Sequence, residues 1–119
     1  FKPVGHLVWH KHYASNSRYL NYRHEQAFLL AKGDPPIPVM ILDDIHPWTY
    51  SGNGLHPNQK SIEIIKPLIA AFSKKGDLVL DPFAGSGTTA LSAKLTGRHY
   101  LAIEKDADYY DAARRRLGY

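Results

Sequence analysis

Apolar residues recur at two different spacings along this chain. Between residues 61 and 72 they recur at every third or fourth position, which predicts a helix that Pro67 kinks or restarts. Residues 5–12 alternate instead, with Leu7 and Trp9 on one side of an extended chain and His6, Val8, His10 and His12 on the other, which predicts a strand. The predicted apolar stripe of the helix comprises Ile62, Ile65, Leu68, Ile69 and Phe72.

Shorter apolar runs predict the remaining elements. Further strands are expected at residues 26–32, 78–80 and 99–103, with a short one at 39–42. One helix is expected at 90–95, and another follows Asp106, whose carboxylate caps it. The order predicts an α/β fold whose four short parallel strands leave open edges, so we expect further chain or a partner to complete the sheet. Four residues of the last helix are expected to face the sheet: Tyr109, Ala112, Ala113 and Leu117.

The most informative segment directly follows the strand at 78–80. It reads Asp-Pro-Phe-Ala-Gly-Ser-Gly-Thr-Thr from Asp81 to Thr89 and leads into a helix. Glycines allow the backbone to pass close to a ligand, and the N–H groups at a helix start favour a negative group. The next strand is followed by Glu104, about 20 residues after Gly85, a spacing at which an acidic residue binds ribose hydroxyls. Together these features predict a site for a ligand that contains a ribose.

Three ligand classes compete for this turn. A nucleoside triphosphate requires a lysine after the last glycine, but Thr88 follows Gly87. A dinucleotide remains open, because Ala90 is tolerated at the third glycine position of its motif. S-adenosylmethionine fits best: Asp81 can bind its ammonium group, and the amides of residues 85–88 can bind its carboxylate. Asp81 would repel the pyrophosphate of a dinucleotide.

Several segments together resemble one known family. Residues 81–89 resemble the cofactor motif of bacterial and phage DNA amino-methyltransferases, which methylate adenine N6 or cytosine N4. His56 to Lys60 resembles the segment before that motif in the permuted, beta-type branch, and residues 97–104 resemble the next strand of the family. Its late-sheet strands resemble residues 9–11, 23–25 and 28–33. We therefore expect a C-terminal part of such an enzyme.

The resemblance implies a partial Rossmann-like, S-adenosylmethionine-dependent methyltransferase sheet with flanking helices. It implies one incomplete domain with late strands at 1–33, a connecting loop at 34–58 and a cofactor-binding half at 59–119. Ser61 stands where the family usually has proline, and serine can still cap a helix there. The implied cofactor-binding residues are Lys60, Ser61, Asp81, Pro82, Phe83, Ala84, Gly85, Ser86, Gly87, Thr88 and Glu104.

The catalytic motif of the family is an Asp/Asn/Ser-Pro-Pro-aromatic loop that holds the target amino group. In the permuted branch this loop precedes the segment seen here. Asp34-Pro35-Pro36-Ile37 resembles it, but Ile37 cannot stack on a base and the segment follows a late strand, so we disfavour a catalytic role for Asp34. We expect the chain alone to be inactive and to act with the rest of the enzyme or a partner chain. The alternatives are a non-catalytic assembly module and, less favoured, a dinucleotide oxidoreductase.

The charge balance adds a mild preference for polyanions. Fifteen Lys and Arg against 11 Asp and Glu leave a net charge of +4. Residues 13–23 are polar and aromatic, which suits contact with double-stranded DNA and equally suits a mobile surface loop. Residues 114–116, all arginine, are interpreted as favourable charge at a helix C-terminus. The candidates for DNA contact are Lys11, Arg18, Tyr19 and Arg23.

Other features mainly exclude classes of function. His6, His10 and His12 could bind a metal, but no acidic residue nearby completes the set, so a solvated or DNA-facing strand is favoured. The chain has no cysteine, which excludes disulfides and fits a cytoplasmic location. No apolar run approaches the roughly 20 residues that span a bilayer. The open sheet edges also leave a homodimer as one way to assemble.

Overall fold

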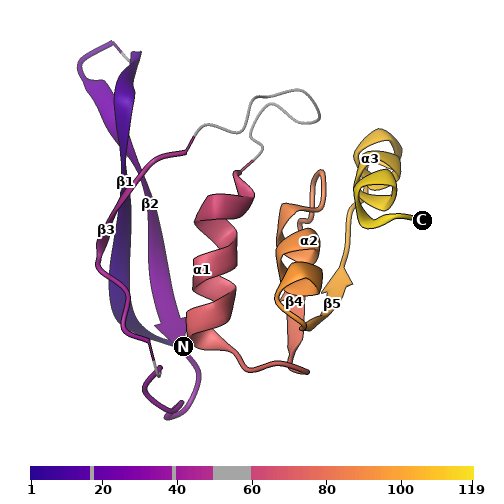
Figure 1. Ribbon diagram of the computed structural model, residues 1–119. Helices are drawn as coiled ribbons and strands as arrows, with labels where there is room; N and C mark the ends of the chain where they lie inside the picture. The colour runs from indigo at the N-terminus through magenta and orange to yellow at the C-terminus, as the bar shows by residue number, and fades with distance from the viewer. Residues whose placement is uncertain (17, 39, 50–59) are drawn as a thin grey trace. The chain divides into compact units, whose positions relative to one another are not determined.

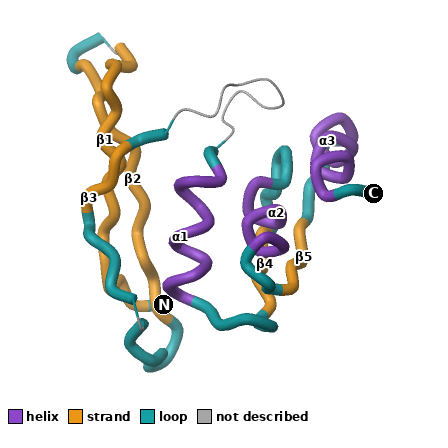
Figure 2. The backbone as a smooth tube through the Cα atoms, in the orientation of Figure 1, coloured by secondary structure: helices purple, strands orange, loops and turns teal. Residues whose placement is uncertain are grey.

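The computed structural model describes residues 1–16, 18–38, 40–49 and 60–119. The chain divides into two compact units, Phe1–Thr49 and Tyr50–Tyr119 (Figure 1). The first unit holds the strands β1 to β3, whereas the second holds the helices α1 to α3 and the strands β4 and β5 (Figure 2).

The first unit is built on a long antiparallel hairpin. Strand β1 (Lys2–Asn16) pairs with β2 (Asn21–Ala31), and the short β3 (Ile45–Pro47) runs parallel to β1 along its other edge. Trp9 stands opposite His46 of β3, and their rings stack with centroids 5.9 Å apart. The three strands therefore form one small sheet of order β2-β1-β3.

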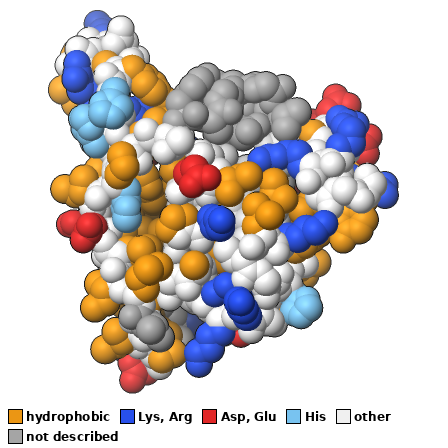
Figure 3. All heavy atoms as spheres, in the orientation of Figure 1, with side chains coloured by type: hydrophobic (Ala, Val, Ile, Leu, Met, Phe, Trp, Pro, Cys, Tyr) orange, Lys and Arg blue, Asp and Glu red, His pale blue; other side chains and the backbone are white. Residues whose placement is uncertain are grey.

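The predicted alternation along β1 is confirmed. Leu7 and Trp9 are buried, while His6, His10 and His12 are exposed. Successive side chains of a strand point to opposite faces, so the histidines share the face away from Leu7 and Trp9. In Figure 3, histidine side chains lie over the strands of this unit.

Three predictions for the strands were wrong. The strands predicted at 5–12 and 26–32 were too short, because residues 13–16 and 21–23 also belong to the hairpin, where Ser15 and Asn16 pair with Tyr22 and Asn21. The strand expected at 39–42 is absent from the described residues 40–42, and β3 lies at Ile45–Pro47 instead. The strands do not form one parallel sheet, since β1 and β2 are antiparallel and β4 pairs only with β5 among the described residues.

The second unit contains a parallel strand–helix–strand arrangement. Strand β4 (Leu78–Asp81) and strand β5 (His99–Ala102) run parallel, and α2 (Thr88–Leu95) connects them and packs on both. Helices α1 (Ile62–Phe72) and α3 (Ala107–Leu117) pack on α2 (Figure 1). Small side chains allow this close packing. Those that are buried include Ala71, Ala90, Ser92, Ala93, Ala112 and Ala113.

Helix α1 begins where the sequence predicted. Ser61 is its N-cap, and its Oγ accepts a hydrogen bond from the Glu63 N–H at 3.2 Å. The helix continues through Pro67, so of the two predicted outcomes, a kink or a restart, the restart does not occur. Its buried residues are Ile64, Ile69 and Ala71, whereas Phe72, expected in the apolar stripe, is 42% exposed. Ile69 thus confirms part of the predicted stripe, whereas Ile62, Ile65 and Leu68 are half-buried.

Helix α3 also confirms its predicted cap. The Asp106 Oδ1 accepts hydrogen bonds from the N–H groups of Asp108 at 3.0 Å and Tyr109 at 3.2 Å. Ala112, Ala113 and Leu117 are buried as expected. They were expected to face the sheet, but α3 packs mainly on α2, where Ala113 approaches Gly87.

Candidate functional site

The predicted glycine-rich turn lies between the end of β4 and the start of α2. Asp81 ends β4, and its Oδ1 accepts a hydrogen bond from the Phe83 N–H at 3.0 Å. The Ala84 N–H donates to the carbonyl oxygen of Ile103, just past β5, at 2.9 Å. The turn therefore lies where the carboxyl ends of two parallel strands meet, which is the usual ligand position in such sheets.

Gly85 and Gly87 both adopt positive φ angles, of 51° and 79°. A Cβ atom on Gly87 would lie 2.9 Å from the Cβ of Ala113 in α3. From the sequence, both glycines are expected to let the backbone pass close to a ligand. The structure gives Gly87 a different role, because its missing side chain and left-handed backbone let α3 pack against the turn.

Glu104 connects the glycine turn to the start of α3. Its Oε2 accepts a hydrogen bond from the Gly85 N–H at 2.7 Å, and its Oε1 accepts one from the Asp106 N–H at 2.9 Å. The structure thus brings together Gly85 and Glu104, the two residues whose spacing suggested a ribose site. A carboxylate can accept about four hydrogen bonds, so contacts with these two amides are compatible with further donors from a ligand.

The N-terminus of α2 offers amide groups to a ligand. Among the described residues, no side chain caps this end, and Gly87 occupies the N-cap position. Of the amides expected to bind a carboxylate, Gly85 donates to Glu104 and Gly87 donates to the Ala84 carbonyl at 2.8 Å. The donors of the first turn of α2, beginning with Thr88, are the ones that a helix normally leaves for an anion.

The residues before α1 also reach the turn. The Thr88 Oγ1 donates to the Lys60 carbonyl oxygen at 3.1 Å, and Ser61 beside it is buried. Within the predicted site, the Phe83 side chain is open, with 88% of its surface exposed. Residues 56–59 of the predicted motif lie outside the described residues.

Sequence reasoning missed Arg116 as a neighbour of this turn. Its Nη1 donates to the Ser86 carbonyl at 2.9 Å, to the Ser86 Oγ at 3.2 Å and to the Thr88 Oγ1 at 3.1 Å. Burial lowers the pKa of the Arg116 guanidinium from its ordinary value. Helical spacing was a usable signal, because Arg116 follows the buried Ala112 by four residues and Ala113 by three and so shares their face.

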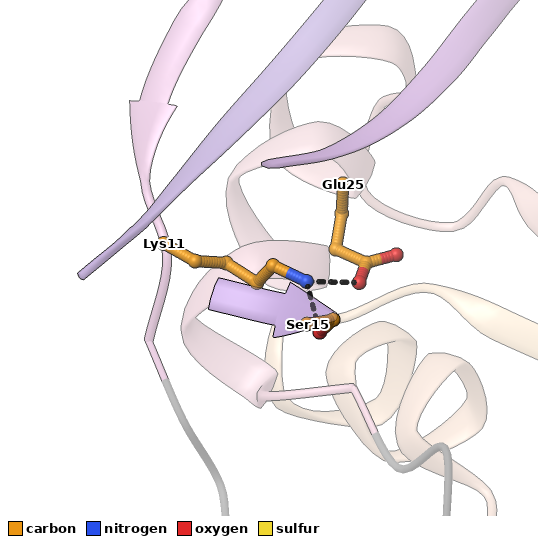
Figure 4. A network of polar contacts seen from close by, with 3 residues as sticks. All are labelled: Lys11, Ser15 and Glu25. Atoms are coloured by element: carbon orange, nitrogen blue, oxygen red, sulfur yellow. Dashed lines mark hydrogen bonds and ion pairs between the residues drawn. The ribbon is translucent and has the colours of Figure 1, made fainter. Parts of the chain in front are cut away.

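Lys11, a candidate for DNA contact, has its side chain buried in an ion pair. Its Nζ donates to the Ser15 Oγ at 3.0 Å and to the Glu25 Oε1 at 3.2 Å (Figure 4). Only 3% of the Lys11 side chain is exposed, so the ammonium group is not presented to solvent. The alternating strand places Lys11 on the buried face with Trp9, a position that favours an ion pair over an unpaired charge.

The other DNA-contact candidates lie at or near the turn that joins the two strands of the hairpin. Arg18 and Tyr19 lie between β1 and β2, and the Arg18 guanidinium stands 5.3 Å from the Tyr19 ring centroid. Arg23 is exposed on β2, and Tyr19 is 81% exposed. Asp34 lies apart from them in an exposed segment after β2. The placement makes these aromatic and basic groups accessible.

Two classes of site find no support in the described part of the chain. No group of three or more His, Asp or Glu side chains there could hold a metal ion. The described helices are also too short or too polar to cross a bilayer.

Comparison with known proteins identifies related sequences. A family described as DNA methylase, of the N6/N4 type, matches residues 40–115. YubD of Escherichia coli strain K12, a provisionally assigned methylase, is 47% identical over 117 residues, which are 98% of this chain and 52% of YubD. The chain therefore spans about half the length of this relative.

Solved structures share the same fold. M1.HpyAVI, in a complex with S-adenosylmethionine, superposes with a TM-score of 0.76 at 29% identity over 98% of this chain and 63% of its own. The cytosine-N4-specific PvuII DNA methyltransferase also gives 0.76, at 17% identity over 95% of this chain and 50% of its own, which is a likeness of fold. These matches confirm the predicted α/β, Rossmann-like fold with flanking helices.

Proposed function

We propose that this chain, a member of the DNA methylase family of the N6/N4 type, supplies the cofactor-binding part of a DNA methyltransferase. The family match confirms the resemblance noted in the sequence. The observation that carries the proposal is the hydrogen bond from the Gly85 N–H to the Glu104 carboxylate at 2.7 Å. It holds the Glu104 carboxylate, which we propose as the ribose acceptor, beside a glycine turn that leads into a helix N-terminus without a cap from any described side chain.

The groups at this turn match the chemistry of S-adenosylmethionine. Glu104 would accept hydrogen bonds from the ribose hydroxyls, and the first amides of α2 would donate to the carboxylate. Asp81 would bind the ammonium group, and the exposed Phe83 ring would lie against an apolar part of the cofactor. When bound, S-adenosylmethionine supplies an activated methyl group on its sulfonium sulfur. The cofactor of M1.HpyAVI supports this choice.

The proposed acceptor is the exocyclic amine of a DNA base, adenine N6 in the first instance. The base must leave the helical stack for its amine to reach a buried methyl donor. Cytosine N4 is the alternative acceptor, supported by the shared fold of the cytosine-N4-specific PvuII enzyme. Arg18, Tyr19 and Arg23 are the proposed DNA contacts, because they combine positive charge with exposed aromatic surface.

The β4–β5 sheet supports a requirement for further protein. Leu78, Leu80, Leu101 and Ile103 are each more than half exposed. The two strands are parallel, and parallel sheets normally have both faces covered. We therefore propose that the remainder of the enzyme, or a second chain, covers this apolar face and contributes the catalytic loop. A homodimer is the alternative partner.

Calorimetry with S-adenosylhomocysteine and with NAD tests the cofactor assignment. We expect the 119-residue chain to bind S-adenosylhomocysteine weakly and not to bind NAD. Glu104→Gln should raise the Kd about tenfold, because one carboxylate oxygen is lost as a charged acceptor. Asp111→Asn is the matched control, since Asp111 is an exposed acidic residue of α3, and it should leave the Kd unchanged. Binding of NAD alone would contradict the proposal.

A methylation assay tests the requirement for further protein. The purified 119-residue chain, with radiolabelled S-adenosylmethionine and DNA of mixed sequence, should transfer no methyl group. Methylated adenine or cytosine formed by this chain alone would show that it carries its own catalytic loop. In that case, loss of methyl transfer in Asp34→Ala would show that the loop containing Asp34 is the catalytic loop.

A further inference from the structure

Arg116 connects the last turn of α3 to the glycine turn. It is separated from Ser86 by 30 residues, yet its Nη1 lies 2.9 Å from the Ser86 carbonyl oxygen. The same nitrogen lies 3.2 Å from the Ser86 Oγ and 3.1 Å from the Thr88 Oγ1. One guanidinium nitrogen therefore contacts both sides of Gly87, the residue at which the turn becomes α2.

The direction of these hydrogen bonds follows from the groups involved. A guanidinium only donates and a backbone carbonyl only accepts. Thr88 Oγ1 must therefore accept from Arg116 and donate its own proton to the Lys60 carbonyl, 3.1 Å away. The resulting chain of hydrogen bonds links α3, the glycine turn and the residue that precedes the cap of α1.

The environment of Arg116 argues against a role in surface charge alone. Ser86 is 4% exposed and Thr88 is 7% exposed, so these oxygen atoms are contacted inside the protein. In the described part of the chain, the atoms that Arg116 contacts are neutral oxygens of Ser86 and Thr88. A positive charge that is partly desolvated without a carboxylate partner is costly, which indicates that its contacts with the turn are specific.

We propose that Arg116 is a positioning residue that holds the glycine turn and the first residue of α2 in the geometry that receives the cofactor. Its positive charge, which lies within hydrogen-bond distance of Ser86 and Thr88, also favours binding of the carboxylate of an amino-acid moiety at the turn. The effect of the charge on a bound carboxylate rests on the proposed function, whereas the positioning of the glycine turn does not. The sequence by itself indicates for Arg116 only a favourable charge at a helix C-terminus.

The first test needs no ligand. We expect Arg116→Gln to accelerate hydrogen exchange of the Gly87 amide, which donates to Ala84, about tenfold relative to the wild type. The amide of Ile103, which donates to Asp81 nearby, is the internal reference and should not change. Arg115→Gln removes the same charge from an exposed neighbour and should leave both amides unchanged. Unchanged exchange at Gly87 in Arg116→Gln would overturn the proposal.

The second test measures binding of S-adenosylhomocysteine by calorimetry. Arg116→Gln should raise the Kd about tenfold, which corresponds to about 1.4 kcal/mol, and Arg115→Gln should not change it. Equal affinity of wild type and Arg116→Gln would overturn the role in binding. A wild-type chain that binds no S-adenosylhomocysteine would refute the proposed cofactor and the charge effect, while the exchange result still decides whether Arg116 holds the turn.

Two further variants test the same proposal if Arg116→Gln does not fold. Arg116→Lys retains the positive charge but loses the planar set of donors, so it should fold and still accelerate exchange at Gly87. Thr88→Val removes the hydroxyl that links Arg116 to Lys60 without changing α3, and it should have the same effect. If both variants leave Gly87 as protected as in the wild type, the proposed chain of hydrogen bonds does not hold the turn.

Discussion

The two units of this chain use their side chains in opposite ways. The first unit exposes most of its aromatic and histidine side chains along a hairpin and buries mainly Leu7, Trp9, Lys11 and Ala31. The second unit packs three helices and two strands around small residues such as Ala90, Ser92 and Ala113. We infer that the first unit depends on a few large contacts, whereas the second depends on close backbone approach and will not tolerate added volume.

The units also differ in how their contacts are spread along the sequence. In the hairpin, β1 pairs with β2, the next strand in the sequence, so the turn between them sets which residues stand opposite each other. At the glycine turn, Gly85 contacts Glu104, and Ser86 contacts Arg116. The candidate site is therefore assembled by helix packing, and changes in α3 should affect it although α3 carries no predicted cofactor residue.

The largest expected effect is loss of the main contact of the first unit. Trp9→Ala should lower the free energy of unfolding of this unit by about 3–5 kcal/mol, because a buried indole that stacks on His46 is removed. Urea titration followed by NMR resonances of β1 and β2 measures it. Tyr19→Ala, which changes an exposed side chain, should cost less than about 0.5 kcal/mol. A loss below 1 kcal/mol for Trp9→Ala would refute the first half of the comparison.

Gly87→Ala, which adds one methyl group, should lower the free energy of unfolding of the second unit by about 2–3 kcal/mol. The new Cβ would meet Ala113 at 2.9 Å, and the positive φ would add strain. Gly76→Ala is the matched control, because Gly76 also has a positive φ but no described atom lies within 4 Å of its Cβ position. It should cost only about 1–2 kcal/mol from strain. Equal losses in chemical denaturation would show that close packing of α3 is unimportant.

Removal of one charge from the Lys11–Glu25 pair should have a smaller effect. Glu25→Gln should destabilise the first unit by about 1–2 kcal/mol, since the buried ammonium loses its carboxylate but Glu25 itself is 40% exposed. Asp34→Asn makes the same kind of change at an exposed position and serves as the control. Thermal unfolding of the two variants compares them, and an equal Tm would indicate that the pair contributes nothing.

The smallest expected effect concerns Tyr100 in the second unit. Its hydrogen bond with the Tyr119 hydroxyl, at 3.2 Å, raises the pKa of Tyr100 above 10.0, and burial and the Tyr119 charge act in the same direction. The neutral phenol is thus favoured by folding, so this contribution to stability is complete below pH 10 and is lost as pH rises through the raised pKa. Absorbance titration should show Tyr100 returning towards 10.0 in Tyr119→Phe. An unchanged titration curve would exclude this hydrogen bond as the cause.

Local signals predicted the ends of the helices and the order of elements around the glycine turn. Ser61 and Asp106 cap their helices because a side-chain oxygen can reach an amide two or three residues ahead. Local signals failed where pairing partners decide the outcome. Residues 13–16 lack the apolar alternation of a strand, yet they belong to β1, where Ser15 and Asn16 pair with Tyr22 and Asn21 of β2. The buried residues of α1 matched the predicted stripe only at Ile69, because apolar spacing alone does not show which side chains the packed elements cover.

The sequence by itself determined the family, the strand–turn–helix motif from Asp81 onward and the pairing of that motif with Glu104, because these depend on residue types at short or regular spacing. Only the tertiary structure decided that Gly87 makes room for Ala113, that Lys11 is buried against Glu25 and that Arg116 contacts Ser86 and Thr88. Each of these depends on the distance between chain segments that meet only when the helices and strands pack. Side-chain chemistry limits the possible partners, and packing selects among them.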